Sequence, residues 1–260
     1  MYIDRYSIKA DARERLRSAV PKPYYEGLLF VLVAGILSAL SSAMMLSNLT
    51  EVNTDVYMKY ILAGRYEDAV RYLQSFDPPL ANYLISNVLD VFRGVVAAGL
   101  SIFAMNTLRK QEASLWNLLD GFGRFLPLLI LLLLMRFLLS FWFSLLVIPA
   151  VFAWYRYRLA VYLLIDNPQL NPFQCILLSG RIMRGRKWEM FLLDLSFLGW
   201  WLLASLPMSI GTAFGGILPM ILGLLGSAAI LAWLVPYHEL SCVGFYEAVK
   251  TPIQSIPPED

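Results

Sequence analysis

Histidine and cysteine are scarce in this sequence. His238 is the only histidine, so no second imidazole can complete an HExxH motif or a similar ligand set. We therefore interpret His238 and Glu239 as polar groups at the end of a helix, and we predict no metal site and no other cofactor. The two cysteines, Cys175 and Cys242, fall in segments that we place in the cytosol, where thiols stay reduced, so we expect no disulfide.

Charged residues are also few, at 15% of the chain, and the net charge is only +2. No run of lysine and arginine alternates with aromatic residues as in proteins that bind single-stranded nucleic acid, so nucleic acid is not an expected partner. The sequence contains no P-loop, no dinucleotide-binding glycine motif and no serine nucleophile elbow. These absences predict that the protein has no catalytic residues and is not an enzyme.

Apolar residues, in contrast, are abundant. They make up 58% of the chain, against about 45–50% in a typical soluble domain, and the mean hydropathy is +0.61. They gather in runs of the roughly 20 residues that a helix needs to cross a bilayer. We predict an all-α polytopic membrane protein: one transmembrane domain over residues 1–260, with a bundle of about six transmembrane helices and short amphipathic cytosolic helices. The predicted spans are 27–47, 86–106, 122–143, 148–166, 189–209 and 215–236.

The third and fourth spans come from one continuous apolar stretch, residues 122–165. Its length of about 44 residues would make a single helix about 66 Å long, roughly twice the hydrocarbon thickness. Pro149 is the helix breaker near the middle of the stretch. We therefore predict a tight turn near 144–149 that separates two spans.

Polar segments complete the predicted architecture. They are a cytosolic basic helix, an extracellular helical segment and a flexible tail, over residues 1–26, 48–85 and 251–260 respectively. The extracellular segment carries four charges in one short stretch, and this excludes a seventh span because each charge facing lipid costs about 2.5–3.5 kcal/mol. Between spans four and five, Asn171 at an N-cap and Pro172 at the first helical position open a further cytosolic helix.

The distribution of basic residues predicts the orientation of the chain. They gather on the side that receives both termini and the loops 107–124 and 167–188, whereas acidic residues outnumber basic ones in 48–85. By the positive-inside rule both termini are cytosolic, in a multi-pass protein of the cell membrane. A single crossing by 122–165 would move the basic loop 167–188 outside, so the charge pattern favours six spans over five.

The second half of the chain carries a motif pattern over residues 145–250. A serine precedes an arginine and a methionine, Gly-x-Lys follows, an apolar run leads into Ser-Phe-x-Gly-Trp, and Pro-Tyr and Phe-Tyr-Glu come after the last span. The residues are Ser179, Arg181, Met183, Gly185, Lys187, Ser196, Phe197, Gly199, Trp200, Pro236, Tyr237, Phe245, Tyr246 and Glu247. This pattern resembles the DUF975 family of bacterial membrane proteins, with Ser241 in place of the family's usual threonine.

The resemblance implies a multi-span membrane protein of unknown function from bacteria, mostly Gram-positive ones. It also implies a distant similarity to the membrane domain attached to some glycerophosphodiester phosphodiesterases. The resemblance supports the predicted topology and implies no catalytic residues.

Ionisable residues inside the predicted spans form the first candidate site. Such charges usually face the bundle interior and pair, because exposure to lipid is costly. They are Asp90, Arg93, Arg136, Arg156, Arg158 and Asp194. Depth along the helices predicts that Asp90 meets Arg136. It also predicts that Asp194 pairs with Arg158 or Arg156. Two interpretations stay open: structural pairing that fixes helix register, and a polar pathway or anionic head-group site.

The basic loop before the fifth span forms the second candidate site. The residues expected to contact lipid head groups are Arg181, Arg184, Arg186 and Lys187. A basic helix at the membrane surface attracts anionic lipid. The same bases also set the topology, and both roles can hold together.

Two classes of function follow from these features. The favoured class is a non-enzymatic accessory, scaffold or transport-related component that contacts membrane lipids, a membrane-protein partner or a second copy of itself. The alternative is a membrane-embedded enzyme acting on lipid, with Asp90, Asp194 or Glu189 as acid or base. The lack of a clustered set of histidine and acidic residues argues against the alternative.

Overall fold

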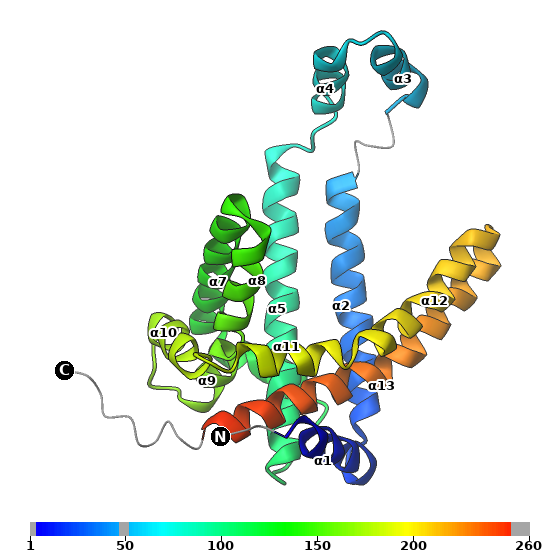
Figure 1. The fold of residues 1–260 in the computed structure, drawn as a ribbon. Helices are drawn as coiled ribbons and strands as arrows, with labels where there is room; N and C mark the ends of the chain where they lie inside the picture. The colour runs from blue at the N-terminus through cyan, green and yellow to red at the C-terminus, as the bar shows by residue number, and fades with distance from the viewer. Residues whose placement is uncertain (1–3, 47–51, 251–260) are drawn as a thin grey trace. The chain divides into compact units, whose positions relative to one another are not determined.

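The computed structural model describes residues 4–46 and 52–250, and all regular structure in these ranges is helical. In chain order (Figure 1) the helices are α1 (Arg5–Ser18), α2 (Pro23–Leu46), α3 (Thr54–Leu62), α4 (Tyr66–Gln74), α5 (Leu80–Leu108), α6 (Asn117–Asp120), η2 (Gly121–Arg124), α7 (Phe125–Leu145), α8 (Val147–Tyr157), α9 (Ala160–Asp166), α10 (Pro172–Ile182), α11 (Lys187–Leu195), α12 (Leu198–Phe214) and α13 (Ile217–Lys250). The predicted tail 251–260 and the start of the segment 48–85 lie outside the described residues.

Helices in the described residues include six stretches long and apolar enough to cross a membrane. They are Pro23–Leu46, Leu80–Leu108, Asn117–Leu145, Val147–Asp166, Lys187–Phe214 and Ile217–Lys250. Each overlaps one predicted span, so the predicted all-α polytopic membrane fold is confirmed. The predicted turn in 122–165 falls at Leu146, whose extended backbone (φ −161°, ψ 145°) separates α7 from α8.

Large apolar side chains on the outer faces of these helices also fit a membrane protein. Leu202 in α12 is 60% exposed, Phe214 80%, and Leu222 in α13 60%. A soluble protein rarely exposes a contiguous apolar surface of this kind. Hydrocarbon is the solvent in which such a surface is stable.

Residue contacts divide the chain into two compact units. The larger unit combines Met1–Leu32 and Gly94–Asp260, and the smaller unit is Val33–Arg93. The boundaries fall within the continuous helices α2 and α5. That the chain forms one transmembrane domain stays a prediction.

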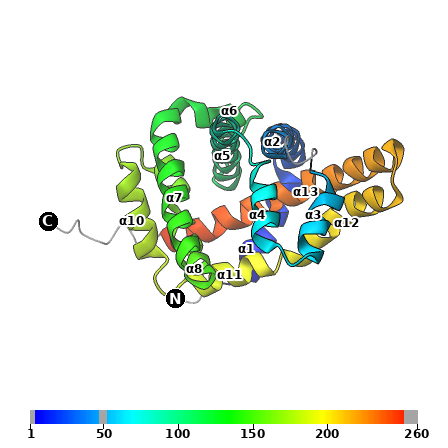
Figure 2. The same ribbon diagram turned by 90° about the horizontal axis from the view of Figure 1, so that it is seen from above.

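The larger unit contains an antiparallel helix pair, α12 and α13, which lie side by side in both views (Figures 1 and 2). The chain reverses between them at Gly215 and Gly216, whose φ values of 67° and 84° suit glycine. Helix α13 continues well beyond the predicted end of the sixth span at residue 236. Pro236 lies inside the helix without ending it.

Helix α1 packs against α13 in the same unit. Its apolar positions Ile8, Ala12 and Leu16 are buried, as their helical spacing favours. On its polar side, Arg13 Nη2 donates to Tyr237 Oη at 3.2 Å. The predicted basic helix is therefore present and docked. Its cytosolic location stays a prediction.

The smaller unit contains α3 and α4, each nine residues long. A nine-residue helix is about 14 Å long and cannot cross a bilayer. Asn53 caps α3, and Arg65 pairs with Asp68 at 2.7 Å at the start of α4. The segment 48–85 thus contains two short surface helices. Its extracellular location stays a prediction.

Candidate functional site

Three basic side chains line one surface cavity of about 470 Å³ in the larger unit. Arg156 comes from α8, Arg184 from the turn after α10, and Lys187 from the first residue of α11. The other lining residues are Phe152, Gly180, Gly185 and Trp188. No acidic residue lines this basic cavity, and in the part of the chain that the structure describes none of the three cations forms an ion pair.

Local sequence signals position these cations. Asn171 and Gln174 form a reciprocal capping box that starts α10. After α10 the chain turns at Gly185, where φ is 80°, and this turn leads into α11. Gly180 leaves room for the neighbouring arginine, because a Cβ atom at this position would lie 2.8 Å from Arg156 Nε.

An apolar cavity of about 410 Å³ adjoins the basic cavity and shares Phe152, Arg156 and Lys187 with it. Its remaining lining residues are Trp142, Ile148, Pro149, Ala153 and Tyr157. Lys187 Nζ lies 5.9 Å from the centre of the Phe152 ring, within cation–π range. A group of cations beside an exposed apolar surface suits an anionic head group with an attached acyl chain.

The predicted head-group residues are thus only partly brought together. Arg184 and Lys187 line the basic cavity, whereas Arg186 Nη1 donates to the carbonyl oxygen of Val249 at 3.5 Å. Arg181 is exposed on α10 and does not line the cavity. Arg156, which sequence analysis places among the intramembrane charges, completes the cavity instead.

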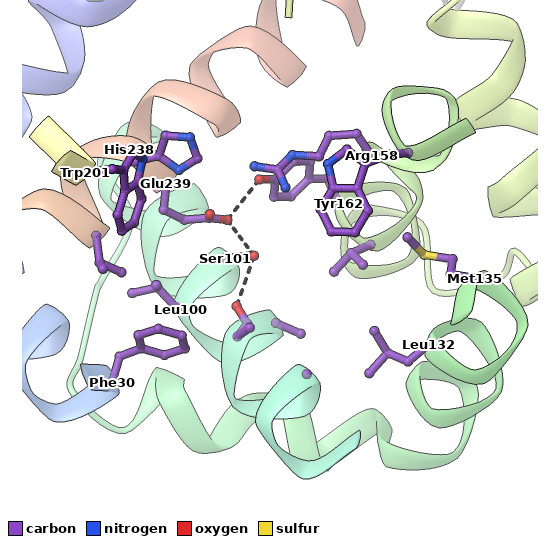
Figure 3. Close-up of a pocket in the computed structure, with 16 residues that line it drawn as sticks. Phe30, Leu100, Ser101, Leu132, Met135, Arg158, Tyr162, Trp201, His238 and Glu239 are labelled. Atoms are coloured by element: carbon purple, nitrogen blue, oxygen red, sulfur yellow. Dashed lines mark hydrogen bonds between the residues drawn. The ribbon is translucent and has the colours of Figure 1, made fainter. Parts of the chain in front are cut away.

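A third cavity in the larger unit, of about 290 Å³, is lined by buried polar residues (Figure 3). Glu239 Oε1 accepts hydrogen bonds from Ser101 Oγ at 2.7 Å and from Tyr162 Oη at 2.9 Å. In Figure 3 these side chains lie at the polar end, and Phe30 and Leu132 lie on the apolar wall. We call this the polar cavity.

Asp194 pairs with His238, and not with an arginine as predicted. Its Oδ1 lies 2.9 Å from His238 Nε2. Arg158 acts on Asp194 only at longer range, since its Nη2 donates to Cys242 Sγ at 3.6 Å. Arg156 lines the basic cavity instead. The prediction used depth along the helices and considered only arginines as partners, so it missed the histidine on α13.

The other predicted intramembrane charges are Asp90, Arg93 and Arg136. Asp90 and Arg93 form an ion pair at 3.5 Å, one helical turn apart in α5. Arg136 is exposed on α7. Because Asp90 and Arg136 belong to different units, their predicted contact stays a prediction.

A charged cluster that sequence analysis did not predict joins the ends of three helices. Arg109, just after α5, contacts Asp166 at the end of α9 (Nη1–Oδ1, 2.8 Å) and Glu247 near the end of α13 (Nε–Oε1, 2.8 Å). Burial lowers the pKa of Arg109, but its hydrogen bonds to the two carboxylates more than offset this and raise the pKa above its ordinary value. We call this set the Arg109 cluster.

Residues 145–252 match the family model described as "Protein of unknown function (DUF975)". This segment is similar to the DUF975 family. The predicted resemblance is thereby confirmed, and the basic cavity lies entirely within the DUF975 segment. No curated protein and no solved structure matches the chain. The more distant similarity to a membrane domain of glycerophosphodiester phosphodiesterases stays a prediction.

Cys175, in the DUF975 segment, should resist alkylation in the folded protein. It is fully buried in α10, and burial raises the pKa of its thiol to about 11. At pH 8 its reactive thiolate fraction should therefore be roughly two orders of magnitude below that of a free cysteine. Maleimide treatment in mild detergent, followed by peptide mass spectrometry, should leave Cys175 unmodified, and denaturation in SDS should allow complete labelling. Rapid labelling before denaturation would contradict its burial.

Proposed function

We propose that this protein is a non-enzymatic, multi-pass component of the cell membrane that binds an anionic lipid, with the lipid phosphate in the basic cavity. The observation that carries the proposal is the set of three cations around one cavity that no acidic residue lines. Basic residues near a membrane surface attract anionic lipid by about 1 kcal/mol each. Three of them together would change the affinity roughly a hundredfold.

The sizes of the two adjoining cavities fit this assignment. Ligand pockets usually have volumes of about 300–1,000 Å³. The basic cavity of about 470 Å³ suits a phosphate-containing head group, and the apolar cavity of about 410 Å³ suits part of one acyl chain. The rest of the lipid would stay in the bilayer, as expected of a site at the protein surface.

Charge removal at the basic cavity should weaken the binding of phosphatidylglycerol roughly a hundredfold. The test variant is Arg156→Gln/Arg184→Gln/Lys187→Gln, titrated with phosphatidylglycerol or phosphatidylcholine and measured by native mass spectrometry. The matched control is Lys59→Gln/Arg65→Gln/Arg71→Gln, with Lys59 in α3, Arg65 at the N-cap of α4 and Arg71 in α4. It removes the same number of charges.

The wild type and the control should bind phosphatidylglycerol more tightly than phosphatidylcholine, and the test variant should not discriminate between them. Equal losses in both triple variants would show a general charge effect and reject the site. Competition with inorganic phosphate tests whether the cavity binds a lipid or free phosphate. If it displaces phosphatidylglycerol at low concentration, the cavity is a free-phosphate site and the lipid assignment fails.

The proposed location of Arg184, Gly185 and Lys187 is the cytosolic side, together with both chain termini, as the positive-inside pattern favours. In a Cys175→Ser/Cys242→Ser background, Gly185→Cys should be protected from a membrane-impermeant maleimide added to intact cells. Asp55→Cys, exposed at the start of α3, should be labelled. External labelling at residue 185 would invert the proposed topology.

Lipid chemistry is the second candidate function, and one observation favours it. Asp194 and His238 form a carboxylate–imidazole pair, and His238 lines the polar cavity beside Glu239. Such a pair can accept and return a proton. Neither Asp90 nor Glu189, the other acids considered, lines this cavity. Lipid turnover by the purified protein that Asp194→Asn abolishes without loss of folding would favour the enzyme.

A further inference from the structure

Three side chains with different ligand atoms converge beside the polar cavity. His238 and Cys242 are four residues apart on α13 and therefore share one face of the helix. Asp194 reaches the same place from α11. One ligand atom from each residue, an imidazole nitrogen, a thiol sulfur and a carboxylate oxygen, lies within 4.8 Å of the other two.

We propose that Asp194, His238 and Cys242 bind a divalent transition-metal ion of the Zn²⁺ type. In a tetrahedral site with a Zn–N bond of about 2.0 Å and a Zn–S bond of about 2.3 Å, these two ligand atoms lie about 3.6 Å apart. The observed distance from His238 Nε2 to Cys242 Sγ is 3.7 Å. Asp194 Oδ1 lies 2.9 Å from His238 Nε2, which is a hydrogen-bonding distance. To become a third ligand, this oxygen would move about 0.5 Å further from the nitrogen.

The chemistry of the ligands selects the class of metal. Magnesium and calcium take oxygen ligands almost exclusively, whereas a nitrogen, sulfur and oxygen set suits zinc and its neighbours. The Asp194 carboxylate and a Cys242 thiolate together neutralise a divalent ion. Arg158 Nη2 donates a hydrogen bond to Cys242 Sγ at 3.6 Å and so helps to fix the position of the sulfur atom.

The surroundings hold the imidazole ring in place for this role. The rings of Phe197 and Trp201 lie 5.1 Å and 5.8 Å from the His238 ring, both at steep angles to it. Because His238 also lines the polar cavity, the fourth coordination position can open towards that cavity. Three protein ligands with one open position are typical of zinc sites that accept water or a further ligand.

This inference is independent of lipid binding, since no residue of the basic cavity is a proposed ligand. The experiment uses the full-length protein with a tag that does not bind metal, stripped by a chelator and then titrated with Co²⁺. We expect one Co²⁺ per chain and a thiolate-to-cobalt charge-transfer band. Cys242→Ser should abolish the band, and Asp194→Asn should weaken Co²⁺ binding at least tenfold. The matched control Cys175→Ser, which removes the other buried thiol, should retain the band.

Absence of the band from the wild type would overturn the proposal, and this arm does not depend on the folding of any variant. Retention of the band in Cys242→Ser would also overturn it, because the sulfur ligand would then lie elsewhere. Zn²⁺ should displace Co²⁺ and remove the band, and failure of Zn²⁺ to compete would reject a site of this class.

Discussion

Gly27→Ala should lower the free energy of unfolding by about 2–3 kcal/mol in detergent, because the added methyl group overpacks a helix contact. A Cβ atom at residue 27 would lie 2.1 Å from the carbonyl oxygen of Ala232 and 2.6 Å from Pro236 Cδ. Proline has no N–H, so the carbonyl of Ala232, four residues earlier, loses its helical hydrogen bond. Helix α2 meets α13 at this proline, and the methyl group could be accommodated only by separating the two helices.

Gly35→Ala provides a control on the same helix. No atom lies within 4 Å of a Cβ placed at residue 35. This substitution should leave stability unchanged or raise it by up to about 1 kcal/mol, because alanine favours a helix more than glycine does. Thermal unfolding of both variants in the same detergent should separate them by several degrees. Equal melting temperatures would show that α2 and α13 are not in contact at Gly27.

Arg109→Gln should also lower the free energy of unfolding by about 2–3 kcal/mol. Removing one partner of a fully buried ion pair costs about 3–5 kcal/mol, and the Arg109 side chain is 26% exposed, which reduces the effect. After the substitution, Lys250 still contacts both Asp166 and Glu247. Lys250 Nζ lies 2.5 Å from Asp166 but 3.9 Å from Glu247, so Glu247 loses its closer partner.

Two comparisons isolate the contribution of the Arg109 cluster. Arg65→Gln breaks the exposed pair with Asp68 and should cost at most about 1 kcal/mol. The double variant Arg109→Gln/Glu247→Gln should lose less than the sum of its single variants, since each substitution removes the same contact. Strict additivity in thermal or denaturant unfolding would mean that the Arg109–Glu247 contact adds no stability.

The span boundaries could be predicted because the bilayer fixes the length of a crossing helix. The stretch 122–165 is too long for one crossing, and Pro149 marks the region where it breaks. The observed break at Leu146 lies within the predicted turn. For the sixth span, in contrast, the sequence predicts an end at residue 236, whereas α13 continues to Lys250. Proline often ends a helix, because it leaves the carbonyl of the residue four positions earlier without a hydrogen bond. Here that carbonyl belongs to Ala232, and it lies against Gly27, which has no side chain to clash with it.

The partners of the buried charges could not be predicted from depth. Depth along a helix gives the position of a side chain only in the direction across the membrane. Its position within the membrane plane depends on which helices pack side by side, and the sequence does not show this. Asp194 and Arg158 lie at compatible depths, yet His238 faces Asp194 more closely. The sequence also gave no signal that Arg156 would join Arg184 and Lys187. That grouping depends on the turn at Gly185 and on the absence of a side chain at Gly180.

The central claim is that an anionic lipid binds where the basic and apolar cavities meet. The most direct measurement is an experimental structure in nanodiscs made with phosphatidylglycerol brominated in its acyl chains, so that bromine marks the lipid. A parallel structure in brominated phosphatidylcholine provides the comparison.

We predict density for a phosphate within hydrogen-bonding distance of Arg156, Arg184 and Lys187, and bromine density along Ile148 and Phe152. Both features should be present with phosphatidylglycerol and absent or much weaker with phosphatidylcholine. An ordered phosphatidylglycerol bound elsewhere on the protein, with no lipid density between Arg184 and Phe152, would contradict the account.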